Sequence, residues 1–203
     1  MSSNNELEEQ ANKIRLCTSC PLSCSRTLAV PGEGCSHADV MFIGEAPGSE
    51  EDSQGRPFVG AAGKKLDALL LSIDLKRDDI FITNVVKCRP PMNRVPTLDE
   101  IKSCFPYLQK QISIVNPKIV CSLGNTALET LTGFRFISRV HGKLLKKSNL
   151  LIFPMYHPAA TLHNPLLKST AEIDFLKLKE SIKETISKQS FSKHENERID
   201  RFI

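Results

Sequence analysis

The sequence predicts an α/β fold of three layers, in which a central sheet of four parallel strands is flanked by helices. Four short runs rich in Ile and Val lie at residues 39–43, 80–86, 118–123 and 150–155. They lack strict alternation of apolar and polar residues, as expected for strands buried on both faces of a parallel sheet. Helical patterns separate them, and strands that alternate with helices imply right-handed βαβ units.

Five helical patterns accompany these strands. They occupy residues 6–16, 62–73, 97–115, 125–131 and 170–186. A capping box of Thr97 and Glu100 indicates the start of the third helix. Beyond residue 187 the chain turns polar and charged. We therefore expect one domain over residues 1–187 and a flexible tail over residues 188–203.

Length and composition bound the possible functions. The 203 residues suffice for one domain with its own core. No run of eighteen apolar residues occurs, and the polar residues 1–10 are unlike a signal peptide, so we expect a soluble protein of the cell interior. The net charge of +4 permits nucleic-acid binding without requiring it.

A glycine-rich loop at residues 44–63 follows the first predicted strand. Open α/β sheets bind ligands at such a position, beyond the carboxyl ends of the strands. The Walker and dinucleotide phosphate patterns both fail, because Phe58 stands where each requires glycine. Glycine lets a ligand approach the backbone and Phe58 offers a stacking face, so the loop suits a flat aromatic ligand better than a phosphate.

Seven cysteines in a chain of this kind favour metal ligation or reactivity over a disulfide framework. Two sets of four are available, a compact set of Cys17, Cys20, Cys24 and Cys35 and a dispersed set of Cys17, Cys20, Cys88 and Cys104. Four thiolates suit zinc or a four-iron four-sulfur cluster, and the spacing separates neither the metals nor the sets. Cys121, inside a strand pattern, is expected to be a buried apolar residue.

Polar residues end two of the predicted strands. The amide of Asn84 can pair with the N3 hydrogen and O4 of uracil, whereas cytosine presents the opposite pattern. An alternative is that Asn84 caps a loop. His157 follows the last strand, and Glu45 and Glu51 lie in the glycine-rich loop, where acids can hold a water or a cation or can simply be solvated.

Five separated motifs together carry a family resemblance. They include residues 44–48 with Glu51-Asp52, residues 55–60 with Ala62-Gly63, residues 83–91 and residues 157–159. In order and spacing, from about Cys17 to Lys183, the chain resembles the family 4 uracil-DNA glycosylases, the iron-sulfur type of archaea and bacteria. The resemblance implies a four-stranded parallel sheet, a four-iron four-sulfur cluster, and hydrolysis of the bond between uracil and deoxyribose in DNA, which starts base excision repair.

The resemblance also assigns roles by position. The cluster ligands would be Cys17, Cys20, Cys88 and Cys104. Phe58 would stack on the flipped base, Asn84 would read its pairing edge, and His157 would hydrogen-bond uracil O2. Glu45 would lie beside the base and sugar, and Glu51 would crowd the C5 position and exclude thymine. Ala46 occupies the place of the water-orienting Asp of better-known uracil glycosylases, which makes Glu45 the first candidate for directing the water.

Further expectations concern partners. Arg89, Arg94 and Leu162 are candidate DNA contacts, and Asn196, Ile199 and Phe202 resemble a sliding-clamp-binding segment in the tail. We expect a monomer in the cytoplasm of an archaeal or bacterial cell. Two other functions fit the same motifs: a broader glycosylase for deaminated or mismatched bases, and a non-catalytic DNA-binding module with an iron-sulfur or zinc site.

Overall fold

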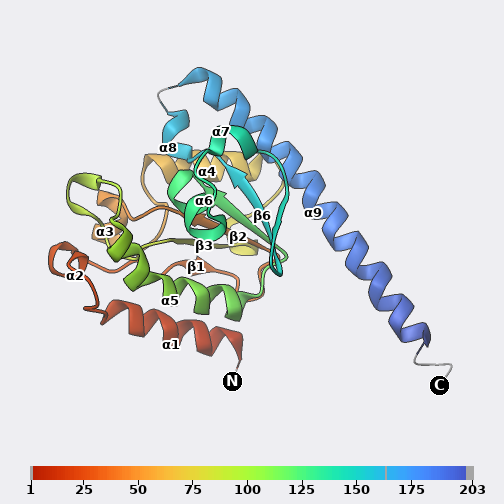
Figure 1. Ribbon diagram of the computed structural model, residues 1–203, viewed down its shortest axis with the longest axis horizontal. Helices are drawn as coiled ribbons and strands as arrows, with labels where there is room; N and C mark the ends of the chain where they lie inside the picture. Colours follow the sequence, from red (N-terminus) through yellow and green to blue (C-terminus); the bar gives the residue numbers. More distant parts are fainter. Residues whose placement is uncertain (1, 163, 200–203) are drawn as a thin grey trace.

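A six-stranded mixed sheet forms the centre of the protein in the computed structural model, which describes residues 2–162 and 164–199 (Figure 1). The strands are β1 (Glu33–Gly34), β2 (Val40–Gly44), β3 (Phe81–Asn84), β4 (Ile119–Leu123), β5 (Leu145–Lys147) and β6 (Leu150–Met155). Their order across the sheet is β1-β3-β2-β4-β6-β5. The neighbouring pairs among β3, β2, β4 and β6 are parallel, and the edge strands β1 and β5 run antiparallel.

The predicted strand number was wrong, because the sheet has six strands and is not wholly parallel. The two additional strands carry no apolar run. Strand β1 is a Glu-Gly pair, and β5 is Leu-Lys-Lys with its two lysines exposed. Short and polar edge strands of this kind protect a sheet from pairing with other chains, and they leave little hydrophobic pattern in the sequence.

The helices are α1 (Ser3–Arg15), α2 (Leu22–Ser25), α3 (Ser49–Gln54), α4 (Ala61–Leu71), α5 (Leu98–Val115), α6 (Asn125–Thr132), α7 (Ile137–Val140), α8 (Pro158–Thr161) and α9 (Pro165–Ile199), with 3-10 turns η1 (Arg77–Asp79) and η2 (Pro91–Asn93). The capping box of Thr97 and Glu100 begins α5, as the sequence predicts. The four-residue helices and the 3-10 turns were not expected, since they are too short to show a helical period.

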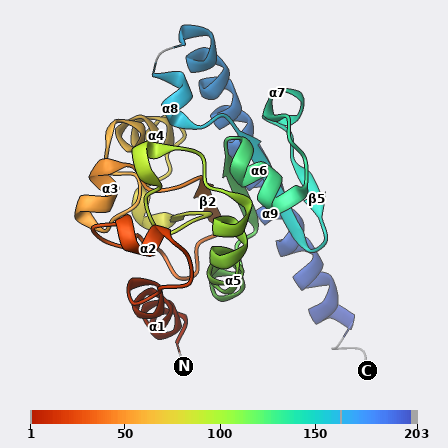
Figure 2. The same ribbon diagram turned by 60° about the vertical axis from the view of Figure 1, so that its left-hand side comes forward.

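Helices cover both faces of the sheet and give three layers. On one face, Phe42 of β2 stacks against Phe175 of α9 with ring centroids 6.1 Å apart, and Leu66 of α4 joins the same core. On the other face, Met41 packs with Leu108 of α5. Helix α1 lies beside α5 on its outer side, as both views show (Figures 1 and 2). The adjacent residues 41 and 42 thus serve opposite cores, as the alternation of a strand requires.

The segment expected to be a flexible tail begins within α9, whose backbone is helical through Ile199. In Figure 1 this helix runs away from the body of the protein. No glycine or proline follows Pro165, so nothing in the local sequence ends the helix at residue 187. Asn196 and Ile199 of the expected clamp-binding segment belong to α9, and Phe202 lies outside the described residues.

No helix in the described part of the chain is long and apolar enough to span a membrane.

The order of the parallel strands positions the ligand site. The chain passes from β2 to β3 on one side of β2 and then crosses to β4 on the other side. The loops after β2 and β4 therefore diverge, and open α/β sheets bind ligands in the crevice at such a switch point.

Candidate active site and cysteine cavity

A cavity of about 840 Å³ opens at the carboxyl ends of the four parallel strands. Every inner strand contributes to its wall through the segment that follows it. The contributions include Glu45, Ala46, Glu51 and Phe58 after β2, Asn84 at the end of β3 with Arg94 beyond it, Asn125 and Thr126 after β4, and Tyr156 and His157 after β6. The structure thus brings together all six residues that the sequence analysis assigned to the base pocket.

Phe58 supplies a buried aromatic wall. The Phe58 side chain is buried. The φ angle of its backbone is +52°, a left-handed conformation that non-glycine residues rarely adopt. Gly44 and Gly63 make this placement possible. A Cβ at Gly63 would lie 1.8 Å from the Phe58 carbonyl oxygen, and one at Gly44 would lie 2.6 Å from the Phe58 ring and 2.4 Å from Asn84 Oδ1. These two glycines are therefore required by close packing around the pocket.

Asn84 presents an unsatisfied acceptor. It is the last residue of β3, it pairs in register with Gly44, and only 1% of its surface is exposed. None of the described residues donates a hydrogen bond to its Oδ1. A buried acceptor without a partner is unfavourable and uncommon in folded proteins. The arrangement therefore favours a ligand that offers an N–H group at this point.

His157 is held in one tautomer. It caps the N-terminus of α8, where its Nδ1 accepts a hydrogen bond from the Ala159 N–H at 3.2 Å. Its ring lies 5.6 Å from the Phe58 ring, centroid to centroid. Desolvation lowers the pKa of His157 from 6.5 to about 4, against an opposing effect of Glu51. At neutral pH the imidazole is thus uncharged, and Nε2 carries the hydrogen that it can donate into the cavity.

Glu45 and Glu51 of the loop accept hydrogen bonds from different kinds of donor. Both oxygens of Glu51 accept backbone N–H groups, from Val59 at 2.9 Å, Gly60 at 2.8 Å and Gly48 at 3.1 Å. Glu45 is half-buried and accepts a hydrogen bond from the hydroxyl of Thr126. Thr126 is not recognisable as a site residue from the sequence pattern, although its position just after a strand marks the same end of the sheet.

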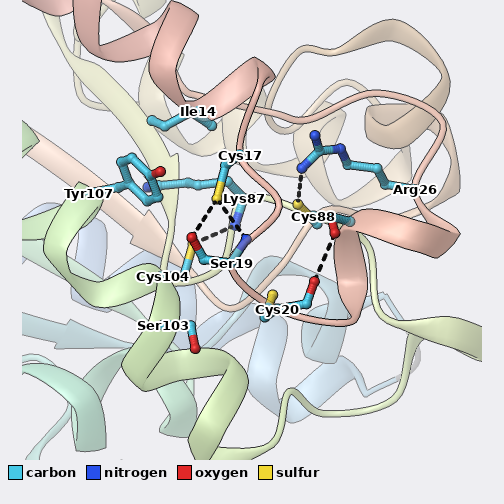
Figure 3. Close-up of a pocket in the computed structure, with 11 residues that line it drawn as sticks. Ile14, Cys17, Ser19, Cys20, Arg26, Lys87, Cys88, Ser103, Cys104 and Tyr107 are labelled. Atoms are coloured by element: carbon cyan, nitrogen blue, oxygen red, sulfur yellow. Dashed lines mark hydrogen bonds between the residues drawn. The ribbon is translucent and has the colours of Figure 1, made fainter.

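Four cysteines line a second, much smaller cavity (Figure 3). They are Cys17, Cys20, Cys88 and Cys104, the dispersed set; Cys24 is exposed and neither Cys24 nor Cys35 lines this cavity. Among the described residues, no group of three or more His, Cys, Asp or Glu side chains is arranged to hold a metal ion. Cys121 is fully buried in β4, as expected.

Hydrogen-bond donors surround these sulfurs. Arg26 donates to Cys88 Sγ at 3.0 Å, and the backbone N–H groups of Lys87 and Ser19 donate to Cys104 Sγ at 3.3 Å and to Cys17 Sγ at 3.5 Å. Burial raises the pKa of Cys104 to about 11, so this thiol needs such partners to bind as a thiolate. The four thiols, three of which accept N–H hydrogen bonds, match in chemical kind the ligands that iron-sulfur clusters use.

Comparison with known proteins decides the family. The family model described as the uracil DNA glycosylase superfamily matches residues 31–178. A type-4 uracil-DNA glycosylase of Sulfurisphaera tokodaii is 48% identical over 184 residues, which cover 86% of this chain and 84% of that protein. The chain belongs to the type-4 uracil-DNA glycosylases. The type-4 enzyme of Archaeoglobus fulgidus is 42% identical over 86% of this chain and 92% of its own, and that of Thermotoga maritima is 42% identical over 78% and 84%.

Arg89 and Arg94, two of the candidate DNA contacts of this type-4 chain, form hydrogen bonds with other side chains of the protein. Arg94 lines the cavity and forms a bidentate ion pair with Glu100. Its Nη2 donates to Glu100 Oε1 at 2.6 Å and its Nη1 to Glu100 Oε2 at 2.8 Å. This pair, with Thr97, lowers the pKa of Glu100 to about 2. Arg89 donates to Asn93 at 2.8 Å, and Leu162, 43% exposed at the end of α8, does not line the cavity. Of the three candidate DNA contacts, only Arg94 therefore borders the pocket.

Lys87 lines the cysteine cavity of this type-4 protein and is hydrogen-bonded to the backbone of Asn84, which lines the larger cavity. Its Nζ is buried and donates to the Asn84 carbonyl oxygen at 2.6 Å, to Thr83 Oγ1 at 2.6 Å and to Gln111 Oε1 at 2.7 Å. The same residue lines the cysteine cavity (Figure 3). The burial of Lys87 could not be predicted from the sequence, because a lysine beside a cysteine in a loop carries no pattern that indicates burial.

Proposed function

We propose that the protein removes uracil from DNA by hydrolysing the bond between uracil and deoxyribose, leaving an abasic site for base excision repair. The observation that carries the proposal is Asn84 Oδ1, a buried acceptor with no hydrogen-bond partner among the described residues. Asn84 lines a cavity that the Phe58 side chain also lines. Uracil offers an N3–H donor to such an acceptor, whereas cytosine offers a lone pair there and leaves the acceptor unpaired. Type-4 relatives that cover most of the chain support the same reaction.

The reaction requires the nucleotide to leave the duplex and enter the cavity, which glycosylases achieve by flipping it from the stack. Phe58 then stacks on the base and Asn84 binds its pairing edge. As the glycosidic bond breaks, negative charge develops on the uracil ring. A preorganised donor at O2, the Nε2–H of His157, stabilises that charge in a pocket from which water is largely excluded.

Glu45 is the proposed partner of the attacking water and of the developing positive charge on the sugar. The neighbouring Ala46 has no group that can orient water, whereas the Glu45 carboxylate borders the cavity and is held by Thr126. Glu51 has a different proposed role. Its carboxylate is fixed by three backbone N–H groups, so it forms a rigid wall that can exclude the methyl group of thymine from the C5 position.

The proposed cofactor is a four-iron four-sulfur cluster bound by Cys17, Cys20, Cys88 and Cys104. When bound, it would cross-link segments that are distant in the chain and so stabilise the loop that follows Asn84.

We further propose that the protein acts as a monomer in the cytoplasm of an archaeal or bacterial cell. Its proposed DNA contacts are Arg89, Arg94 and Leu162. Asn196, Ile199 and Phe202 are proposed to form a segment that binds the sliding clamp.

Replacing Cys104 by alanine is expected to abolish stoichiometric iron and sulfide in the purified protein and to lower its melting temperature, because the cluster loses one of four ligands. Cys24→Ala is the matched control, since Cys24 is exposed and lies outside the cavity. Elemental analysis of both variants and of the unsubstituted protein gives the measurement. Zinc in place of iron in the unsubstituted protein would contradict the proposed cofactor.

The function itself is tested with oligonucleotides that differ only at one base. We expect alkali-labile sites in strands that contain uracil and none in strands that contain cytosine or paired thymine. Strands with hypoxanthine or with thymine opposite guanine test the broader glycosylase. If cluster-loaded protein binds uracil DNA without cleaving it, the catalytic proposal is wrong and the protein is a binding module.

A further inference from the structure

Arg77 reaches the backbone that carries the pocket's aromatic wall. It lies in the 3-10 turn η1, outside the cavity, and 22% of its side chain is exposed. Its Nη1 donates to the Phe58 carbonyl oxygen at 3.2 Å, and its Nη2 donates to the carbonyl oxygen of Pro57. One guanidinium thus holds two consecutive peptide carbonyls of the loop.

The guanidinium is itself fixed from two other directions. Its Nε donates to Glu33 Oε1 at 2.9 Å, and its Nη1 also donates to Asp67 Oδ1 at 3.0 Å. Glu33 belongs to β1 and Asp67 to α4, so the arginine joins an edge strand and a helix to the loop. Only the planar fork of arginine offers donors in these directions together, and a lysine ammonium cannot reproduce them.

The conformation of Phe58 explains why such a clamp is needed. With φ at +52°, its backbone occupies a region that is sterically unfavourable for a bulky side chain. Strained residues of this kind persist only where the surrounding structure determines their conformation. The missing Cβ of Gly63 makes room for the Phe58 carbonyl, and Arg77 supplies the hydrogen bond that the carbonyl accepts.

We propose that Arg77 is a positioning residue for the uracil pocket, which acts by holding the strained 57–58 backbone so that the Phe58 ring faces the base and packs beside His157. This inference rests on the proposed glycosylase function. Arg77 touches neither the base nor the sugar in this role. Its influence on the reaction passes entirely through Phe58.

The chain offers a matched control in Arg56. It binds the same carboxylate, with its Nε 2.8 Å from Glu33 Oε2, but it is more exposed than Arg77 and both of its hydrogen bonds go to Glu33. Removing Arg56 therefore breaks an ion pair with Glu33 while leaving the carbonyl clamp in place.

Kinetics on uracil DNA separate the two arginines. We expect Arg77→Ala to lower kcat/KM by about 10- to 100-fold, since displacement of a positioning group by about 1 Å can cost that much. Arg77→Lys should lose nearly as much, whereas Arg56→Ala should stay within about twofold of the unsubstituted enzyme. If Arg77→Ala does not fold, Arg77→Lys carries the comparison, because it keeps the charge and the aliphatic stem.

Two further readouts distinguish positioning from general stability. In a Phe58→Leu background, Arg77→Ala should cost less than about twofold, because its effect acts through the aromatic ring. Loosening of Phe58 should also admit water to His157 and move the acid limb of kcat upward from about pH 4, whereas Arg56→Ala leaves it in place.

The outcomes are separable. Equal losses from Arg77→Ala in the unsubstituted and Phe58→Leu backgrounds would overturn the positioning role, as would a lower melting temperature with unchanged kinetics. Unsubstituted protein and Arg56→Ala serve as positive controls for uracil excision. If both are inactive, the proposed function fails; if both are active and Arg77→Lys matches them, this inference fails alone.

Discussion

Asn84→Asp is expected to lower kcat/KM on uracil DNA by about a hundred- to a thousandfold and to create a measurable activity on cytosine. Asn84 lies buried at the end of β3, and its Oδ1 has no hydrogen-bond partner within the part of the chain that the structure describes. Burial raises the pKa of a carboxyl group, so the introduced side chain is expected to be largely protonated at this position. It then offers one acceptor and one O–H donor, which match the amino group and N3 of cytosine.

The gain of cytosine excision, together with the loss of uracil excision, distinguishes a change in base recognition from a general loss of structure. A variant that merely disturbed the fold would lose uracil excision without gaining another substrate. Asn116→Asp is the matched control, because Asn116 is exposed at the end of α5 and remote from the cavity lining. Matched strands with a single uracil or cytosine provide the measurement. Unchanged uracil excision by Asn84→Asp would show that the amide does not read the base.

The inner strands and the residues at their ends could be predicted from the sequence. Apolar runs are long enough in β2, β4 and β6 to reveal buried strands, and ligand-binding residues in α/β sheets follow strands. Their positions made Asn84 and His157 candidates for the site, and the family resemblance supplied their expected roles. The edge strands could not, because β5 consists mostly of exposed lysines.

Contacts that depend on tertiary packing could not be predicted from the sequence. The spacing of Cys17 and Cys20 indicates a shared ligand site, but the other two members depend on how β3 and α5 are packed. Arg77 gave no signal either. Its role arises because a short 3-10 turn, invisible as a periodic pattern, brings it beside the Pro57 and Phe58 carbonyls.

His157→Ala is expected to lower kcat by about a hundred- to a thousandfold with little change in KM, the cost of removing one preorganised donor at a developing anion. The donor is needed most when the glycosidic bond breaks and least when the base first binds. His37→Ala is the control, because His37 is exposed and lies outside the cavity lining. Single-turnover rates with saturating enzyme isolate this step. A large rise in KM with unchanged kcat would assign His157 to base binding alone.

The pH dependence tests the protonation state of the same group. Desolvation places the pKa of folded His157 at about 4, below the ordinary value of 6.5, so kcat should stay flat from about pH 8 to about pH 5. The unfolded chain takes up this proton first, so the stability contributed by the neutral imidazole is present above pH 6.5 and lost as pH falls through about 4. An acid limb of kcat near pH 6.5 would contradict a neutral donor.

A neutral donor also fits the geometry of the pocket. The Ala159 N–H occupies Nδ1 and leaves Nε2–H as the only hydrogen that the imidazole can donate. Charging the ring would require Nδ1 to give up this acceptor role, and the cap of α8 would be lost with it. The same hydrogen bond that begins the helix therefore keeps the imidazole uncharged and aims its remaining N–H at the position where uracil O2 would acquire its charge.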